Sequence, residues 1–145
     1  MKRALARNKS DSEDGLDVLS KVGGFEIGEL AGLILGACKC RKPVLVDGFI
    51  STAAALIAGS ICPPAMDFVF AAHRSADPGH EIMLSHLKKS PLLDLDLRLG
   101  EGTDVVLERP LMDSAAVLLS KYMTFEEAAV SEAGAGTDSW RLSAS

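Results

Sequence analysis

Two short apolar runs, each followed at once by polar residues, constrain the fold of this 145-residue chain most strongly. The first is Val44-Leu45-Val46, closed by Asp47-Gly48, and the second is Asp67–Ala72, which leads into His73-Arg74-Ser75. Short uninterrupted apolar runs are typical of strands buried in a parallel sheet. A helical stretch separates the two runs and another follows them. The order strand, helix, strand, helix predicts βαβ units and an α/β fold with a parallel sheet.

Helical periodicity, caps and chain breakers predict the remaining elements. The predicted helices are residues 16–22 with a break at Gly23-Gly24, Glu26–Cys38, Ala53–Ala58 with Ser51 or Thr52 as cap and Gly59 as end, residues 78–88 with Asp77 as cap and Pro78 at the first position, and a last helix opened by Pro110. The last helix carries one apolar face, made of Leu111, Ala115, Leu118, Leu119 and Tyr122. Between these helices, Leu92–Leu99 is a mixed apolar segment that leads to Gly100-Glu101-Gly102.

Composition narrows the class of protein. Hydrophobic residues make up 48% of the chain and charged residues 24%, which indicates a packed core. The net charge of −5 and an aromatic content of 5% argue against a nucleic-acid partner. No apolar run is long enough to span a bilayer, and no apolar signal core follows the basic start of the chain, so we expect no membrane association.

The cysteines indicate a reducing compartment. There are three of them, Cys38, Cys40 and Cys62, and no second Cys or His pair at matching spacing completes a zinc site with Cys38 and Cys40. We therefore expect reduced thiols in a cytoplasmic protein. We also expect neither a metal nor a cofactor.

A ligand site is expected where the strands end, because ligands of parallel sheets bind beyond the carboxyl ends of the strands. Three segments are expected there, Asp47-Gly48-Phe49, His73-Arg74-Ser75 and Gly100-Glu101-Gly102. Asp47 there is either a ligand-orienting carboxylate or a turn residue that bonds to its own backbone. Ser75 is either a phosphate contact at a helix start or an ordinary cap. Arg74 pairs with a phosphate or, more commonly, with a structural carboxylate.

Other polar residues near these ends have weaker functional interpretations. His73 and His80 would form a metal site only if they converged across a helix boundary, which we do not expect. Asp94 and Asp96 alternate with leucines, as on a solvated strand face. The phosphate-binding loop of nucleotide hydrolases, the Gly-x-Gly-x-x-Gly pattern and the Gly-x-Ser-x-Gly nucleophile pattern are all absent from the sequence.

Glu101 is the candidate catalytic residue. It lies between Gly100 and Gly102, and flanking glycines let a backbone approach a ligand closely. A carboxylate in such a position is a candidate general base, although many strings of this kind are plain turns.

Five stretches together resemble the C-terminal part of nicotinate-nucleotide–dimethylbenzimidazole phosphoribosyltransferase, the CobT family. In chain order they are Leu16–Ile27, Pro43–Ala55, Ala72–His80, Leu92–Thr103 and Met123–Ala128. The resemblance covers about residues 14–128. It implies part of a doubly wound parallel (Rossmann-like) sheet with flanking helices, without the family's N-terminal half. We expect residues 1–13 to be a disordered or frayed start and residues 129–145 to be a disordered tail.

The resemblance also implies an activity, the transfer of phosphoribose from nicotinate mononucleotide to 5,6-dimethylbenzimidazole. The products are nicotinate and α-ribazole 5′-phosphate, which serves the lower nucleotide loop of cobalamin. By resemblance, Glu101 is the catalytic base, Ser75 contacts the nucleotide phosphate, and Leu99 and Gly100, with Gly102 beside them, line the base pocket. Asp47 and Glu26 match acidic family positions near the site. The family's homodimer is the expected assembly.

Three departures from the family leave an alternative open. The upstream half is absent, and it carries part of the sheet, a glycine-rich phosphate loop and a lysine near the phosphate. Asp104 stands where the family usually has glycine, and the sequence after Ala128 does not follow the family. The alternative is a catalytically inactive remnant that binds a nucleotide or benzimidazole, or a partner subunit.

Overall fold

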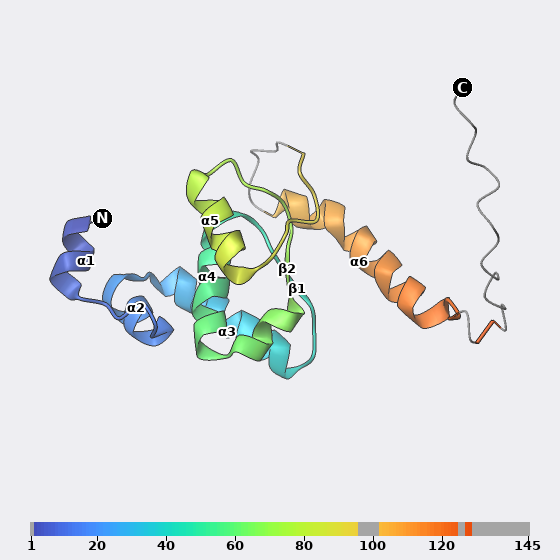
Figure 1. The fold of residues 1–145 in the computed structure, drawn as a ribbon, viewed down its shortest axis with the longest axis horizontal. Coiled ribbons are helices and arrows are strands. Elements are labelled where there is room, and N and C mark those ends of the chain that lie inside the picture. The colour runs from blue at the N-terminus through green and yellow to red at the C-terminus, as the bar shows by residue number, and fades with distance from the viewer. Residues whose placement is uncertain (1, 96–101, 125–126, 129–145) are drawn as a thin grey trace, which may run out of the picture. The chain divides into compact units, whose positions relative to one another are not determined.

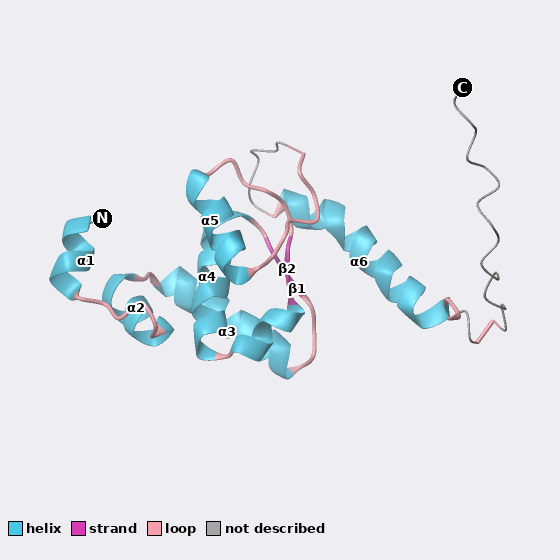
Figure 2. Ribbon diagram, in the orientation of Figure 1, coloured by secondary structure: helices cyan, strands magenta, loops and turns pink. Residues whose placement is uncertain are grey.

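The computed structural model describes residues 2–95, 102–124 and 127–128. The elements in chain order are α1 (Lys2–Asn8), α2 (Gly15–Val22), α3 (Phe25–Lys39), β1 (Val44–Val46), α4 (Gly48–Ile61), the 3₁₀ helix η1 (Pro63–Phe68), β2 (Val69–Ala71), α5 (Pro78–Leu87) and α6 (Thr103–Lys121). Figure 1 traces this order along the chain, and Figure 2 shows that helices make up most of the described part.

A pair of parallel strands organises the fold. Strand β1 pairs with β2 in the register Val44↔Val69, Leu45↔Phe70 and Val46↔Ala71. The pair confirms the two predicted strands, their parallel direction and a mixed α/β class. Because the strands are parallel, their carboxyl ends meet at one edge, so Asp47 and the residues after Ala71 leave the sheet on the same side.

Helix α4 is the central packing element. It contacts α2, α3, α5, η1 and β1. Its buried face consists largely of small residues, and Ala54, Ala55 and Ala58 have no exposed surface. Small side chains let neighbouring backbones approach closely, and α3 supplies Ala31 and Ile34 to the same core. The hydrophobic core therefore lies between α3, α4 and the inner side of the two strands.

The start and end of α4 differ from the prediction. Ser51 and Thr52 do not cap the helix; their hydroxyls donate to the carbonyls of Asp47 and Gly48, four residues back along the chain. The helix begins at Gly48, directly after the strand, and Gly59 does not end it. The helix ends at Ile61 with Cys62 as its C-cap, since Pro63 disfavours a helical conformation in the residue before it.

The second strand is shorter than predicted. Asp67 and Phe68 belong to η1, and β2 starts at Val69. Pro63 opens η1, and the Ala65 amide donates to the Cys62 carbonyl at 2.9 Å. Proline at the first position favours a helical turn, which overrides the extended tendency of the residues that follow.

The last helix also starts earlier than predicted. Pro110 lies inside α6 and does not open it. A proline inside a helix forfeits one backbone hydrogen bond, but the helix continues on both sides of it. The predicted apolar face is exposed at its large members, including Leu111, Leu118 and Leu119.

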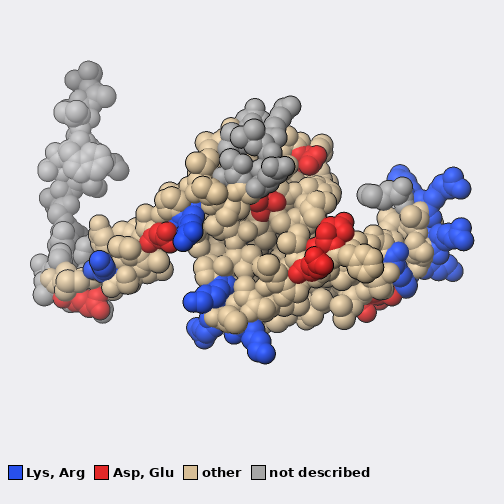
Figure 3. Space-filling view, turned by 180° about the vertical axis from the view of Figure 1, so that it is seen from behind, with Lys and Arg blue, Asp and Glu red and all other residues tan. Residues whose placement is uncertain are grey.

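The other helices follow the sequence closely. Helix α3 spans the predicted Glu26–Cys38 with one more residue at each end, and α5 begins at Pro78 with Asp77 as its cap. Lys39, Arg41 and Lys42 gather at the C-terminal end of α3, where the helix dipole favours bases, and Figure 3 shows a group of basic side chains there and another over α1.

The chain divides into two compact units, residues 1–111 and 112–145. Within residues 1–13, Lys2–Asn8 form α1, none of whose residues is buried. Residues 129–145 lie outside the described part. In the described ranges, no helix combines the length and apolar character that a membrane crossing requires.

A glycine pair tests the turn between β1 and α4. Gly48 has a φ of +72°, which side-chain-bearing residues resist, whereas Gly32 lies in the exposed part of α3 with open space around it. We expect Gly48→Ala to lower the free energy of unfolding by about 1–2 kcal/mol. The control Gly32→Ala should raise it by about 0.5–1 kcal/mol, because alanine favours helix. Urea unfolding measures both, and equal effects of the two substitutions would contradict the assigned turn.

Candidate strand-end site

The candidate site is the edge of the sheet where β1 and β2 end. A third segment joins them there, because Leu93 bridges to His73 in the parallel sense and the Leu92 amide donates to the Ala71 carbonyl at 2.9 Å. The described start of the predicted Leu92–Leu99 segment therefore lies beside the end of β2, joined to it by an isolated bridge, while the sheet of the described residues has two strands. Three segments far apart in sequence thus reach one edge, as the topology predicted.

Asp47 connects the first of these segments to the third. The backbone N–H of Gly102 donates to Asp47 Oδ2 at 3.2 Å, across 55 residues of sequence. Gly102 has a φ of +77°, so the left-handed conformation that glycine favours is in use at this turn. Asp47 is therefore more than a turn residue that bonds to its own backbone: its carboxylate holds the backbone directly after Glu101.

Ser75 lies in the loop between β2 and α5. Its hydroxyl lies 3.4 Å from Asp77 Oδ2 and accepts from the Asp77 amide at 3.3 Å, both long hydrogen bonds. Ser75 thus sits in a tight local turn just before a helix start, where backbone N–H groups favour anions.

Arg74 pairs with carboxylates. Its Nε donates to Asp94 Oδ2 and its Nη1 to Glu81 Oε1, each at 2.9 Å. The structural alternative predicted from the sequence is therefore correct for Arg74. Asp94 is exposed, and this pair holds the loop after β2 against the third segment.

His80 lies at the centre of the polar contacts. Its side chain is 1% exposed, its Nδ1 accepts the backbone N–H of Ser75 at 3.1 Å, and its Nε2 lies 2.9 Å from Thr52 Oγ1. Burial lowers the pKa of His80 below its ordinary value of 6.5, against the opposing attraction of Asp77. His80 therefore stays neutral at neutral pH.

His73 makes a separate contact. It is 2% exposed, and its Nε2 accepts the Leu95 amide at 3.1 Å. One ring nitrogen of each buried histidine is thus engaged by a backbone amide. Among the described residues, no three His, Cys, Asp or Glu side chains come together as possible metal ligands. Cys38, Cys40 and Cys62 carry free thiols.

The remaining predicted site residues lie elsewhere or outside the described part. Glu26 is exposed in the first turn of α3, and no described contact joins it to Asp47, Ser75 or Gly102. Leu99, Gly100 and Glu101 fall outside the described residues. Asp104 is the second residue of α6.

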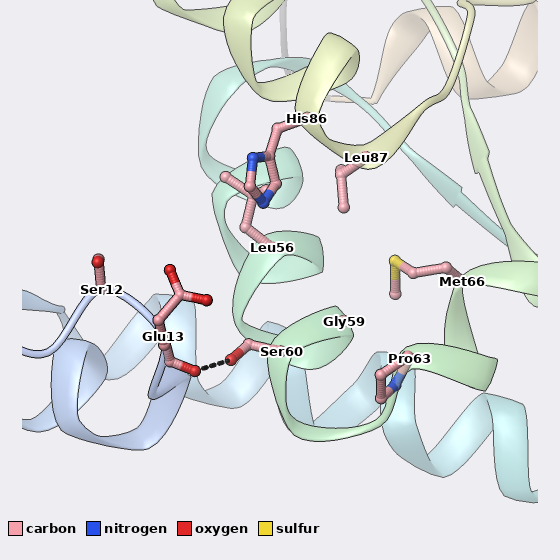
Figure 4. A pocket seen from close by; sticks show the side chains of 9 residues that line it. All are labelled: Ser12, Glu13, Leu56, Gly59, Ser60, Pro63, Met66, His86 and Leu87. Atoms are coloured by element: carbon pink, nitrogen blue, oxygen red, sulfur yellow. Dashed lines mark hydrogen bonds between the residues drawn. The ribbon is translucent and has the colours of Figure 1, made fainter.

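A cavity of about 370 Å³ lies at a different place, between the loop before α2, the far end of α4, η1 and α5 (Figure 4). Its lining includes Ser12, Ser60 and His86 and none of the predicted site residues. The axial rise of an α-helix puts Ser60 roughly 18 Å along α4 from Gly48. The cavity is therefore distinct from the strand-end site.

Comparison with models of protein families shows the family to which the chain belongs. A phosphoribosyltransferase family model, DBI_PRT, matches residues 1–130. The chain belongs to the DBI_PRT phosphoribosyltransferase family. This confirms the resemblance drawn from the five sequence stretches.

Proteins from several bacteria are similar to the chain. The nicotinate-nucleotide–dimethylbenzimidazole phosphoribosyltransferase of Syntrophotalea carbinolica is 58% identical over 132 residues, which are 91% of this chain and 37% of that protein. The enzyme of the same name from Chloroflexus aggregans is 53% identical over 91% of this chain and 37% of that protein. The chain therefore spans little more than a third of the length of these relatives.

A solved structure is similar to the chain over the matched part. The crystal structure of CobT from Thermus thermophilus superposes with a TM-score of 0.78 at 45% identity. The match covers 90% of this chain and 39% of that one.

Two residues of the site were not assigned to it from the sequence. His80 was considered only as a metal ligand and Thr52 only as a helix cap. A usable signal existed for His80: Asp77-Pro78 marks a helix start and places His80 at the third helical position, where side chains reach back to the preceding loop.

Substitution of Asp47 tests the connection to Gly102. We expect Asp47→Ala to raise the hydrogen-exchange rate of the Gly102 amide about ten-fold, because a hydrogen bond to an ionised acceptor contributes roughly 1.5 kcal/mol. Asp47→Asn keeps an acceptor oxygen and should give a smaller increase. Exchange measured by NMR that is unchanged in Asp47→Ala would show that the carboxylate does not hold this turn.

Proposed function

We propose that the chain forms the C-terminal part of an enzyme that transfers phosphoribose from nicotinate mononucleotide to 5,6-dimethylbenzimidazole. The relatives of this name at up to 58% identity support the proposal. The observation that carries it is local: Asp47, the Ser75 loop and Gly102 meet at one sheet edge, and Glu101 directly precedes Gly102. The site therefore combines a helix start suited to a phosphate with a candidate base.

Glu101 is the proposed general base. The acceptor's ring nitrogen forms a bond to C1 of the ribose while the bond from C1 to the nicotinate nitrogen breaks. The nicotinate nitrogen takes the electron pair of the broken bond, so the leaving group needs no proton. The second nitrogen of the benzimidazole ring loses its proton, and a carboxylate within hydrogen-bond reach accepts it. The products are α-ribazole 5′-phosphate and nicotinate.

The other residues have supporting roles in this proposal. Ser75 binds the phosphate with its hydroxyl, whose long hydrogen bonds to Asp77 are readily exchanged for a phosphate oxygen. Leu99, Gly100 and Gly102 line the base pocket. Asp47 orients the turn that carries Glu101, and Glu26 supplies a carboxylate from α3.

The proposal also concerns the part of the fold beyond the two strands. We place β1 and β2 in a larger, doubly wound parallel sheet completed by the part of the relatives' length that the match does not cover. Such a sheet, in a cytoplasmic homodimer, would supply the rest of the phosphate and acceptor pockets.

A second function, a module that binds a partner subunit, is favoured by exposed apolar side chains. Phe25 is 94% exposed and Ile82 is 73% exposed, which is unusual for large apolar residues of a packed unit. An activity assay with nicotinate mononucleotide and 5,6-dimethylbenzimidazole separates the two functions. Formation of α-ribazole 5′-phosphate by the purified chain supports a catalytic unit, whereas product only after addition of the N-terminal half of a relative supports a partner-dependent one.

Substitution of Glu101 tests its role in whichever preparation is active. We expect Glu101→Gln to lower turnover by about 10²–10⁴-fold, the usual contribution of a general base, with little change in the affinity for nicotinate mononucleotide. The control Glu29→Gln removes an exposed carboxylate of α3 and should leave turnover unchanged. Full turnover in Glu101→Gln would exclude Glu101 as the base.

A further inference from the structure

His80 connects two of the segments that meet at the sheet edge. It extends from α5 and contacts the Ser75 backbone after β2 on one side and Thr52 of α4 on the other. Thr52 has no exposed surface, and its hydroxyl also contacts the Gly48 carbonyl at 2.7 Å. A chain of hydrogen bonds therefore runs from the Ser75 loop to the turn beside Asp47.

The hydrogen-bond partners of His80 determine which of its ring nitrogens carries the proton. The Ser75 backbone N–H donates, so His80 Nδ1 must carry a lone pair. The Gly48 carbonyl accepts, so the Thr52 hydroxyl spends its proton there and accepts at its oxygen. His80 Nε2 must then carry the proton and donate to Thr52. Every group is satisfied by one tautomer, the neutral ring protonated at Nε2.

We propose that His80 is a positioning residue whose neutral Nε2–H tautomer holds the Ser75 loop at the first turn of α4, and that protonation of His80 releases Ser75. A second proton on the ring would sit on Nδ1, directly opposite the Ser75 N–H. Two donors cannot share a hydrogen bond, so the loop must move away. Weaker phosphate binding after the release of Ser75 is expected only if Ser75 binds the phosphate, which rests on the proposed function. The tautomer of His80 and its hydrogen bond to Ser75 do not depend on that function.

The charges around His80 set the direction of its pH response. Asp77, in the loop before α5, favours the protonated ring, whereas His73 and Arg74, after β2, disfavour it, and α4 faces it with the uncharged Thr52 hydroxyl. Burial outweighs these charges and lowers the pKa of His80 below 6.5. The unfolded chain therefore takes up the proton first as pH falls. The stabilising contribution is present above pH 6.5 and is lost as pH falls through the lower pKa of the folded state.

Two variants of His80 test its hydrogen bonds to Ser75 and to Thr52 separately. In His80→Asn the side-chain oxygen replaces Nδ1 and keeps an acceptor for Ser75. In His80→Gln the amide nitrogen replaces Nε2 and keeps a donor to Thr52. A loss of packing alone affects both variants, whereas the proposed hold on Ser75 survives only in His80→Asn.

NMR of the full chain tests the proposal. We expect the ring nitrogens of His80 to report the Nε2–H tautomer at pH 7, and the Ser75 amide to lose protection together with His80 protonation, after correction for intrinsic exchange. At pH 7, Ser75 exchange should rise about ten-fold in His80→Gln and stay near the wild-type value in His80→Asn. An Nδ1–H tautomer or a charged ring at pH 7 would overturn the proposal, and so would a Ser75 exchange rate unaffected by the state of His80.

Calorimetry with nicotinate mononucleotide then tests the consequence for binding. The affinity of the wild-type chain for nicotinate mononucleotide should decrease at pH values below the pKa of His80, and that of His80→Asn should decrease less. At pH 7, His80→Gln should bind nicotinate mononucleotide about ten-fold more weakly than the wild-type chain. Equal affinity and equal pH dependence in all three proteins would contradict the positioning role in binding. Absence of binding by the wild-type chain at every pH would count against the proposed function, while the tautomer measurement still decides the role of His80.

Discussion

The parallel pairing of β1 with β2 is the constraint on which the rest of the structure depends. Three residue pairs fix the register, and this register puts Asp47 and the His73–Ser75 stretch at one edge of the sheet. The helix between the strands can return along the sheet only if it packs closely. The fully buried alanines of α4 allow this, because they present little volume to α3 and the strands. The parallel pairing of β1 with β2 therefore positions both the hydrophobic core and the candidate site.

Much of this arrangement could be predicted from local sequence. An apolar run of three residues before Asp47-Gly48 defined β1, and Asp77-Pro78 fixed the start of α5. Elements were misplaced where a residue has two competing roles. The hydroxyls of Ser51 and Thr52 suit a helix cap, but here they bond to carbonyls one turn back. Pro110 suits a first helical position, but α6 continues through it.

The location of the candidate site could be predicted from the sequence, but most of its hydrogen bonds could not. Topology alone brought the segments of Asp47, Ser75 and Gly102 to one edge, and the hydrogen bond from Gly102 to Asp47 joins two of them. The network of Thr52, His80 and Ser75 could not be read from the sequence, because its members come from three elements and each has a common local role. From the sequence, His73 and His80 are considered only as a metal pair, which is not expected; in the structure a backbone amide engages one ring nitrogen of each.

We propose the sheet edge, and not the cavity at the other end of α4, as the nucleotide site. The most direct test is a titration of the isotope-labelled chain with nicotinate mononucleotide, followed by NMR. If the sheet edge binds the nucleotide, we expect the backbone amide signals of Ser75, Asp77 and Gly102 to shift first and together. Shifts confined to Ser12, Ser60 and His86, which line the cavity, would contradict it.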